Sequence, residues 1–397
     1  MNSTKKNISL PLQLTFFIFS MVLNCMGIVI LQLSQENVSY EKLGFLESFK
    51  DLPIAIVSLF AVNFISKLGS KKSIIIALGI VGICSLILPF VDDFWFYKLW
   101  FAIIGACFAI GKICVYGIIR NNIIDVKELA KTMNSVEASY TIGFFVVNVG
   151  FGSLIASAYS EYWKFGFTAI SLISFFTIYL FWKTDIIEAD KTIKSNIISN
   201  LSSFNTKHIW LFFAILFFIV FTEQSFNSWL PTFYKNHLNV NSFFALQATS
   251  MFALFSYFGR IITANIIERF SLNAYAKVCL LSIMTLLIVI FGIQIYFVQG
   301  SQIVLFLFPL IGLFLSPLYP LFNSKMISRI DNSKINTFTS VIVIFSSFGS
   351  SMSSILMSLL FKNKLLPYYS IYVLSVVTVI FVLSIFYFKQ EHIKTEK

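Results

Sequence analysis

Long apolar runs separated by short polar loops make up most of this chain. A run of about 18 or more apolar residues is typical of a helix that crosses a membrane. The first run follows two lysines, as in a signal peptide, but it lacks a small-residue cleavage site, so we expect it to be retained. The pattern predicts about twelve spanning helices, over residues 12–33, 44–66, 73–91, 95–118, 135–158, 163–183, 209–233, 244–267, 275–298, 302–324, 336–360 and 366–388.

The composition agrees with a chain that lies in a lipid bilayer. Hydrophobic residues make up 57% of the sequence and charged residues 12%, whereas about 25% of a soluble domain is charged. The net charge of +11 does not indicate nucleic acid, because the basic residues lie between apolar runs. The five cysteines fall inside those runs without metal-ligand spacing, so we expect no metal, cofactor or disulfide.

One long polar stretch, 184–207, separates six predicted spans from the next six. We predict an N-terminal six-helix bundle over 1–183, a linker over 184–207 and a C-terminal six-helix bundle over 208–397. Lys and Arg in short loops favour the cytoplasmic side of a membrane. The orientation that puts most of the 29 basic residues on that side places both termini and the linker in the cytoplasm.

This layout resembles the major facilitator superfamily, whose two halves are repeats around a substrate site near the middle of the membrane. The family carries a motif between its second and third helices: a glycine, an acid-base pair, a second glycine and a basic pair. In the corresponding loop of this chain, Lys67, Gly69, Lys71 and Lys72 match, whereas Val62 replaces the first glycine and Ser66 the acid.

The equivalent loop of the second half, 264–271, keeps an acid-base pair, Glu268 and Arg269, without the glycines. The two loops lie about half a chain apart, as an internal repeat predicts. In the family this motif helps to latch the cytoplasmic side in one access state. The resemblance therefore implies a transporter that works by alternating access, with Glu268 and Arg269 as gating residues in place of the acid that the first loop lacks.

Ionisable side chains within predicted spans are the first functional candidates, because a charge at the bilayer centre is costly. Lys112 lies inside the fourth span, and Tyr116 and Arg120 follow one and two turns later on the same face. We expect Lys112 and Tyr116 to bind an anionic or carboxylate-bearing solute. The alternative is a lysine that pairs with a carboxylate or extends to the interface, while Arg120 marks the cytoplasmic end or gates it.

The seventh span is polar around Glu223 and Asn227, which lie one turn apart. Glu223 is the leading candidate for proton coupling, because the protonation of a carboxylate responds to burial and to nearby charge. Asn227, with Asn24 of the first span and Asn148 of the fifth, is a candidate substrate contact. The alternative for Glu223 and Asn24 is hydrogen bonding between helices.

The second span begins with Glu47, Lys50 and Asp51, which share one face in the outer half of the membrane. Asp51 precedes Pro53, whose missing N–H loosens the helix. We expect Asp51 to accept a proton and Glu47 and Lys50 to gate the outer side. The alternative is a span that starts near Pro53 and leaves this cluster in water.

The remaining gating candidates lie at span ends and at a predicted helix break. Glu137 is expected to pair with Lys131 or Arg120 as an inner latch, and Arg260 lies in the eighth span. Pro317 and Pro320 must interrupt the tenth helix, which makes a hinge.

Together these patterns predict a secondary active transporter for a small anionic or zwitterionic solute, with a proton as coupling ion. We expect a monomer in a bacterial-type inner membrane, in contact with lipid and with no nucleic-acid partner. An exporter of a siderophore, drug or metabolite, or a sugar permease, is the alternative. A membrane-embedded enzyme is the remote one, because the three histidines lie at span edges or in a tail and no catalytic motif is present.

Overall fold

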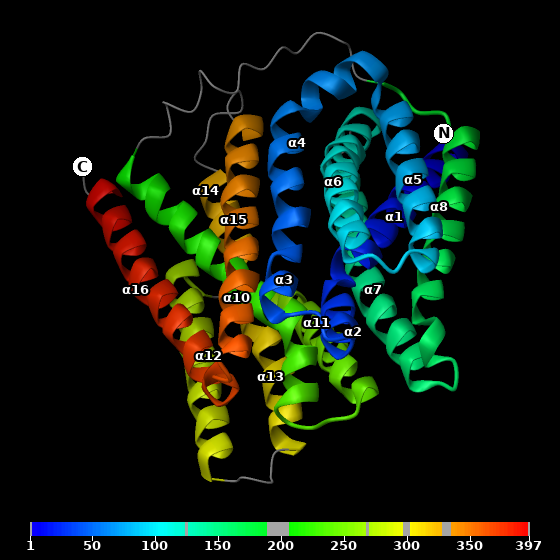
Figure 1. The fold of residues 1–397 in the computed structure, drawn as a ribbon. Helices are drawn as coiled ribbons and strands as arrows, with labels where there is room; N and C mark the ends of the chain where they lie inside the picture. The colour runs from blue at the N-terminus through cyan, green and yellow to red at the C-terminus, as the bar shows by residue number, and fades with distance from the viewer. Residues whose placement is uncertain are drawn as a thin grey trace. The chain divides into compact units, whose positions relative to one another are not determined.

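The computed structural model describes residues 2–123, 126–188, 206–266, 270–296, 302–327 and 335–395. These residues form helices and connecting loops, and none of them lies in a strand (Figure 1). The first half contains α1 (Asn2–Asn24), α2 (Met26–Gln35), α3 (Tyr40–Gly44), α4 (Leu46–Leu68), α5 (Ser70–Ile87), η1 (Leu88–Phe90), α6 (Phe94–Asn122), α7 (Val126–Ala156), η2 (Ser160–Phe165) and α8 (Gly166–Lys183). The second half contains α10 (Lys207–Asn236), α11 (Ser242–Ile266), α12 (Leu272–Tyr296), α13 (Gln302–Leu315), α14 (Leu318–Ile327), α15 (Ile335–Lys362), η6 (Leu366–Tyr368) and α16 (Tyr369–Thr395).

The helices coincide with the predicted spans. Within the described residues, ten segments are long and apolar enough to cross a membrane. The two predicted spans not among them, 44–66 and 244–267, are occupied by α4 and α11. The prediction of an all-helical membrane protein with about twelve spans is therefore confirmed.

Apolar side chains lie on the outer faces of the helices as well as in the core. On α5, Leu78 and Val81 are fully buried, whereas Ile76, Ile80 and Ile83 are exposed along another face. On the buried side, Ser174 of α8 donates to the Leu78 carbonyl oxygen at 2.8 Å. Small residues at a helix interface and apolar residues facing outward are typical of helices whose solvent is lipid.

The first predicted span contains a break that its sequence pattern does not predict. We expected one helix over 12–33, but α1 ends at Asn24 and α2 begins at Met26. The Asn24 amide donates to the Ser20 carbonyl oxygen at 2.9 Å, and the Cys25 thiol donates to the Val22 carbonyl oxygen at 3.1 Å. These side chains occupy backbone acceptors in the last turn of α1, which favours a helix end at this point.

The break predicted at Pro317 is present, since α13 ends at Leu315 and α14 starts at Leu318. Proline has no N–H to offer the carbonyl four residues earlier, here that of Leu313. Gly259 of α11 packs against this carbonyl so closely that an added Cβ would overlap its oxygen. The Ser316 hydroxyl donates to the Ser256 carbonyl oxygen at 2.7 Å. The break thus coincides with tight packing of α13 on α11.

The helices form two compact units, which we describe separately. Unit 1 comprises the described residues of Met1–Met26 and Phe49–Asn196, and unit 2 those of Gly27–Ser48 and Ile197–Lys397. The segment 27–48, which the prediction places in the first bundle, therefore packs in unit 2. The predicted boundaries at 184 and 208 remain a prediction, and most of the linker, 189–205, lies outside the described residues.

Close packing explains why segment 27–48 belongs to unit 2. A Cβ added to Gly44 of α3 would overlap the Ser358 side chain of α15. At the outer edge of the same contact, Asn236 donates to the Tyr40 hydroxyl at 2.8 Å, and Lys362 lies 2.6 Å from the Glu41 carboxylate. The segment is thus held to α10 and α15 by both backbone contact and polar pairs.

Candidate functional site

Polar and aromatic side chains from three helices of unit 1 gather in one place. We call this set the unit 1 cluster. It consists of Phe16 and Asn24 of α1, Phe108, Lys112 and Tyr116 of α6, and Glu137 and Tyr140 of α7. The three helices pack against one another. Gln13 of α1, one turn before Phe16, also hydrogen-bonds Ser135 of α7. Each helix is a long membrane-spanning element, so the cluster lies on rigid backbone.

Lys112 is the cation of the unit 1 cluster. Its side chain is half-buried, and Nζ lies 5.8 Å from the centre of the Phe108 ring. Among the described residues the Lys112 ammonium makes no ion pair or hydrogen bond. The lysine that the sequence singled out therefore keeps its donors available, whereas the side chain of Arg120 lies outside the described residues.

Glu137 is the anion of the same cluster. One of its carboxylate oxygens accepts a hydrogen bond from the Tyr116 hydroxyl, and the side chain is exposed. We expected Glu137 to pair with Lys131 or Arg120, whose side chains lie outside the described residues. The bond to Tyr116 was not expected, and it links the Glu137 carboxylate to a residue one helical turn from Lys112 on α6.

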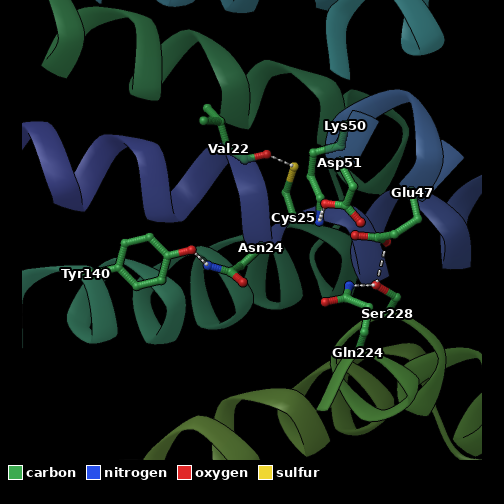
Figure 2. Close-up of polar contacts among 9 residues, drawn as sticks. All are labelled: Val22, Asn24, Cys25, Glu47, Lys50, Asp51, Tyr140, Gln224 and Ser228. Carbon is green, nitrogen blue, oxygen red and sulfur yellow. Dashed lines mark hydrogen bonds and ion pairs between the residues drawn. The ribbon is translucent and has the colours of Figure 1, made fainter. Parts of the chain in front are cut away.

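Asn24 and four aromatic rings complete the unit 1 cluster. The Asn24 amide nitrogen donates to the Tyr140 hydroxyl at 3.3 Å (Figure 2). The centre of the Phe16 ring lies 5.7 Å from that of Tyr116 and 6.2 Å from that of Tyr140. Phe108 lies 6.4 Å from Tyr140 by the same measure. Asn148, by contrast, is buried and donates to Phe144 of its own helix at 2.9 Å.

Unit 2 contains a different polar group, which we call the unit 2 network. Gln224 of α10 donates to the Ser228 hydroxyl at 2.5 Å, and Ser228 donates to the Glu47 carboxylate at 2.9 Å (Figure 2). Nearby, the Trp229 indole N–H donates to Ser354 at 2.9 Å, and the Tyr369 hydroxyl donates to the Ser225 carbonyl oxygen at 2.8 Å. These residues join the first turn of α4, which belongs to unit 2, to α10, and they join α10 to α15 and α16.

The charged residues at the start of α4 are almost completely buried. Glu47 is 0% exposed, Lys50 6% and Asp51 5%. Lys50 Nζ lies 3.8 Å from the Asp51 carboxylate, so these two charges offset each other within unit 1. This burial does not fit the alternative in which the cluster lies in water.

Glu223 and Asn227 lie on α10 beside the unit 2 network. Glu223 is half-buried, and Arg260 of α11 is near enough to act electrostatically on its carboxylate. The side-chain oxygen of Asn227 is buried and accepts no hydrogen bond within the described part of the chain. Pro317 lies in the α13–α14 break and Pro320 in the first turn of α14, whereas Glu268 and Arg269 lie outside the described residues.

An acidic residue that the sequence did not single out, Glu188, binds the backbone at the junction between α4 and α5. The Glu188 carboxylate accepts hydrogen bonds from the backbone N–H groups of Ser70 at 2.6 Å and Lys71 at 2.8 Å. Lys71 Nζ also donates to the Thr184 carbonyl oxygen at 2.7 Å. A carboxylate at a helix N-terminus is stabilising. Glu188 therefore supplies a negative charge to the loop in which Ser66 replaces the expected acid.

The described residues contain no group of three metal-binding side chains. Among these residues, both units offer polar side chains that can bind a solute or hold helices together. The unit 1 cluster has one cation and one anion with free bonding capacity, whereas the unit 2 network is largely satisfied internally.

Comparisons with known proteins identify the type of fold. The family model described as Major Facilitator Superfamily matches residues 12–354. A search of curated proteins finds no match. Among solved structures, a D-xylose-proton symporter is similar with a TM-score of 0.80 at 12% identity, covering 97% of this chain and 98% of the other. A proton-dependent oligopeptide transporter structure has a TM-score of 0.77 at 10% identity, with 100% of both chains covered. A point mutant of the nucleoside transporter NupG has a TM-score of 0.74 at 13% identity, covering 96% of this chain and 100% of the other.

Proposed function

This chain belongs to the major facilitator superfamily, and from that premise we propose that it moves a small anionic or zwitterionic solute across a bacterial-type inner membrane. The chain is a multi-pass membrane transporter and not an enzyme. The proposed mechanism is alternating access coupled to protons, carried out by a monomer. The similar structures are 10–13% identical to the chain, so they support the fold, and the proposal for the solute rests on the residues of this chain.

The half-buried Lys112 carries the proposal for the solute. A lysine within a span costs about 2.5–3.5 kcal/mol on membrane-insertion scales. Within the described residues, no carboxylate offsets that cost by pairing with Lys112. A fixed cation in a medium of low dielectric attracts a carboxylate much more strongly than it would in water. A neutral sugar would leave this charge unpaired, so an anionic group on the solute fits better.

Two carboxylates support proton coupling. Glu223 lies within electrostatic reach of Arg260, and Asp51 lies 3.8 Å from Lys50 Nζ. Protonation would cancel the attraction of either carboxylate for its cation. Proton binding at one of these pairs would therefore change the contacts between or within helices, which is what coupling requires.

The test is uptake into liposomes that contain the purified full-length protein. Sugars, carboxylates, amino acids and siderophores are supplied with and without an imposed pH gradient. We expect a carboxylate-bearing solute to accumulate only with the gradient, and Lys112→Ala to lower its uptake at least about tenfold, because a charge-assisted hydrogen bond contributes about 1.5–3 kcal/mol.

Lys98→Ala is the matched control. Lys98 lies on the same helix, is half-buried, and contacts aromatic rings, with Nζ 5.0 Å from the centre of Phe94. Equal losses in the two variants would show a general packing effect. Movement of neutral solutes that does not depend on Lys112 would reject the proposed solute class and leave a transporter of another specificity.

A further inference from the structure

The unit 1 cluster holds two opposite charges that do not neutralise each other. Lys112 and Glu137 lie on neighbouring helices, and they are connected through Tyr116, which is one turn from Lys112 and hydrogen-bonded to Glu137. Side chains one turn apart have Cβ atoms about 5–6 Å apart. Lys112 nevertheless rests over Phe108, and Glu137 is held by Tyr116. Each charge thus has a separate contact within the cluster, and the two do not form an ion pair with each other.

Both charges retain bonding capacity that a ligand can use. Lys112 has three N–H donors, and none of them reaches an acceptor among the described residues. A carboxylate has two oxygens, and the Tyr116 hydroxyl engages one oxygen of Glu137. Glu137 is also exposed, so its second oxygen is accessible.

The aromatic rings favour a cation at the Glu137 end of the cluster. Phe16 lies edge-on to both Tyr116 and Tyr140, and Phe108 is tilted against Tyr140. Ring faces attract ammonium groups when water is partly excluded. The rings therefore add to the attraction that Glu137 has for an amine, and they give the solute carbon atoms an apolar surface.

We propose that the unit 1 cluster binds a small zwitterion, with Lys112 receiving its carboxylate and Glu137, backed by the rings of Tyr116 and Tyr140, receiving its ammonium group. The inference rests on the proposed transport function and narrows its substrate class. A dicarboxylate would place its second charge against Glu137, a diamine would place one against Lys112, and a polyol would leave both charges unpaired. Only a solute that carries both signs satisfies both side chains.

The experiment compares four-carbon solutes that differ mainly in charge. Liposomes containing the full-length protein receive radiolabelled 4-aminobutanoate, 2-aminobutanoate, succinate, 1,4-diaminobutane or erythritol, each with an imposed pH gradient. We expect one or both aminobutanoates to be taken up at least tenfold faster than the other three. The better of the two reports the spacing between the charges that the cluster prefers.

Glu137→Gln then separates recognition from structure. Glutamine keeps a carbonyl oxygen for the Tyr116 hydroxyl and removes only the negative charge. We expect uptake of the preferred aminobutanoate to fall at least tenfold relative to uptake of butanoate, which lacks the amine. A purely structural role would lower both equally. Glu41→Gln, which removes an exposed carboxylate of unit 2, is expected to leave the ratio unchanged.

The outcomes distinguish this inference from the proposed function. Preference for succinate or butanoate over the aminobutanoates, or an unchanged ratio in Glu137→Gln, would overturn the zwitterion site while leaving an anion transporter. Uptake of erythritol alone, or of none of the solutes, would contradict the proposed function and this inference with it.

Discussion

The unit 1 cluster and the unit 2 network contain similar residue types but differ in how many of their polar groups are paired within the protein. In the unit 2 network, the fully buried Glu47 carboxylate accepts a hydrogen bond from the Ser228 hydroxyl. The Ser228 hydroxyl oxygen in turn accepts one from the Gln224 amide. In the unit 1 cluster, Glu137 is exposed and Lys112 has no anion beside it within the described residues. One set of polar groups is hydrogen-bonded between helices, whereas the other contains a cation and an exposed carboxylate that do not pair with each other.

The difference shows that polarity within a span does not by itself mark a binding site. A polar residue in lipid needs partners, and neighbouring helices usually provide them. The feature that distinguishes a candidate binding residue is a charge or hydrogen-bonding group that remains unpaired after the contacts with neighbouring helices are counted. By that measure Lys112 and Glu137 differ from Ser228 and Trp229, whose side-chain hydrogen bonds join helices; we therefore propose the first pair as binding residues.

The largest expected effect comes from a substitution that separates two packed helices of unit 2, α11 and α13. Gly259→Val should destabilise the protein by about 3 kcal/mol or more, because the new side chain would overlap the Leu313 carbonyl and α13 would have to move. Thermal unfolding in detergent measures the effect. Gly292→Ala is the control, since a Cβ added there meets nothing within 4 Å. Equal stability of the two variants would contradict the packing of α11 on α13.

A smaller change tests whether the unit 2 network is structural. Ser228→Ala leaves Glu47 buried without the Ser228 donor, so we expect a loss of about 1–3 kcal/mol in stability. Tyr116→Phe is the matched change in unit 1, where Glu137 is exposed and water can replace the lost hydroxyl. We expect Tyr116→Phe to alter uptake while its unfolding temperature stays close to that of the wild type. The reverse pattern would assign binding to unit 2 and packing to unit 1.

The smallest expected effect is a pH dependence at the end of α10. Burial lowers the pKa of His237 below its ordinary value of 6.5. The folded state then holds fewer protons than the unfolded state, so stability falls as the pH drops below 6.5 and levels off below the folded pKa. Thermal unfolding between pH 5 and 7.5 tests this, and His237→Gln should flatten the curve. An unchanged slope in the variant would assign the dependence to other groups.

The positions of the helices could be predicted from the sequence because each is a long apolar run between charged loops. The break at Pro317 could also be predicted, since proline removes a backbone donor. The break at Cys25 could not, because no proline or glycine stands at that position to signal it. The packing of segment 27–48 in unit 2 has no such signal in the sequence, because hydropathy shows which residues enter a membrane and not which helices they pack against.

The candidate site was only partly predictable for a similar reason. Lys112, Tyr116 and Asn24 could be singled out because polar residues are rare in spans, and the structure brings them into one cluster. Tyr140 had no such signal among the 16 tyrosines of the chain. From the sequence, Glu188 is indistinguishable from the other charged residues of the linker. The backbone N–H groups that donate hydrogen bonds to its carboxylate lie 117 and 118 residues away. Contacts over such separations come from tertiary structure and leave no local pattern.

Segment 27–48 precedes the central linker in the sequence but packs in unit 2, and this affects how the protein can be recombined with its relatives. A chimera that exchanges everything before the central linker would also replace Gly27–Ser48, which packs inside unit 2. The incoming segment would have to supply a residue as small as Gly44 against Ser358 and an acid for Ser228. The natural module for exchange is therefore discontinuous in the gene, and a transplant that respects it needs three joints instead of one.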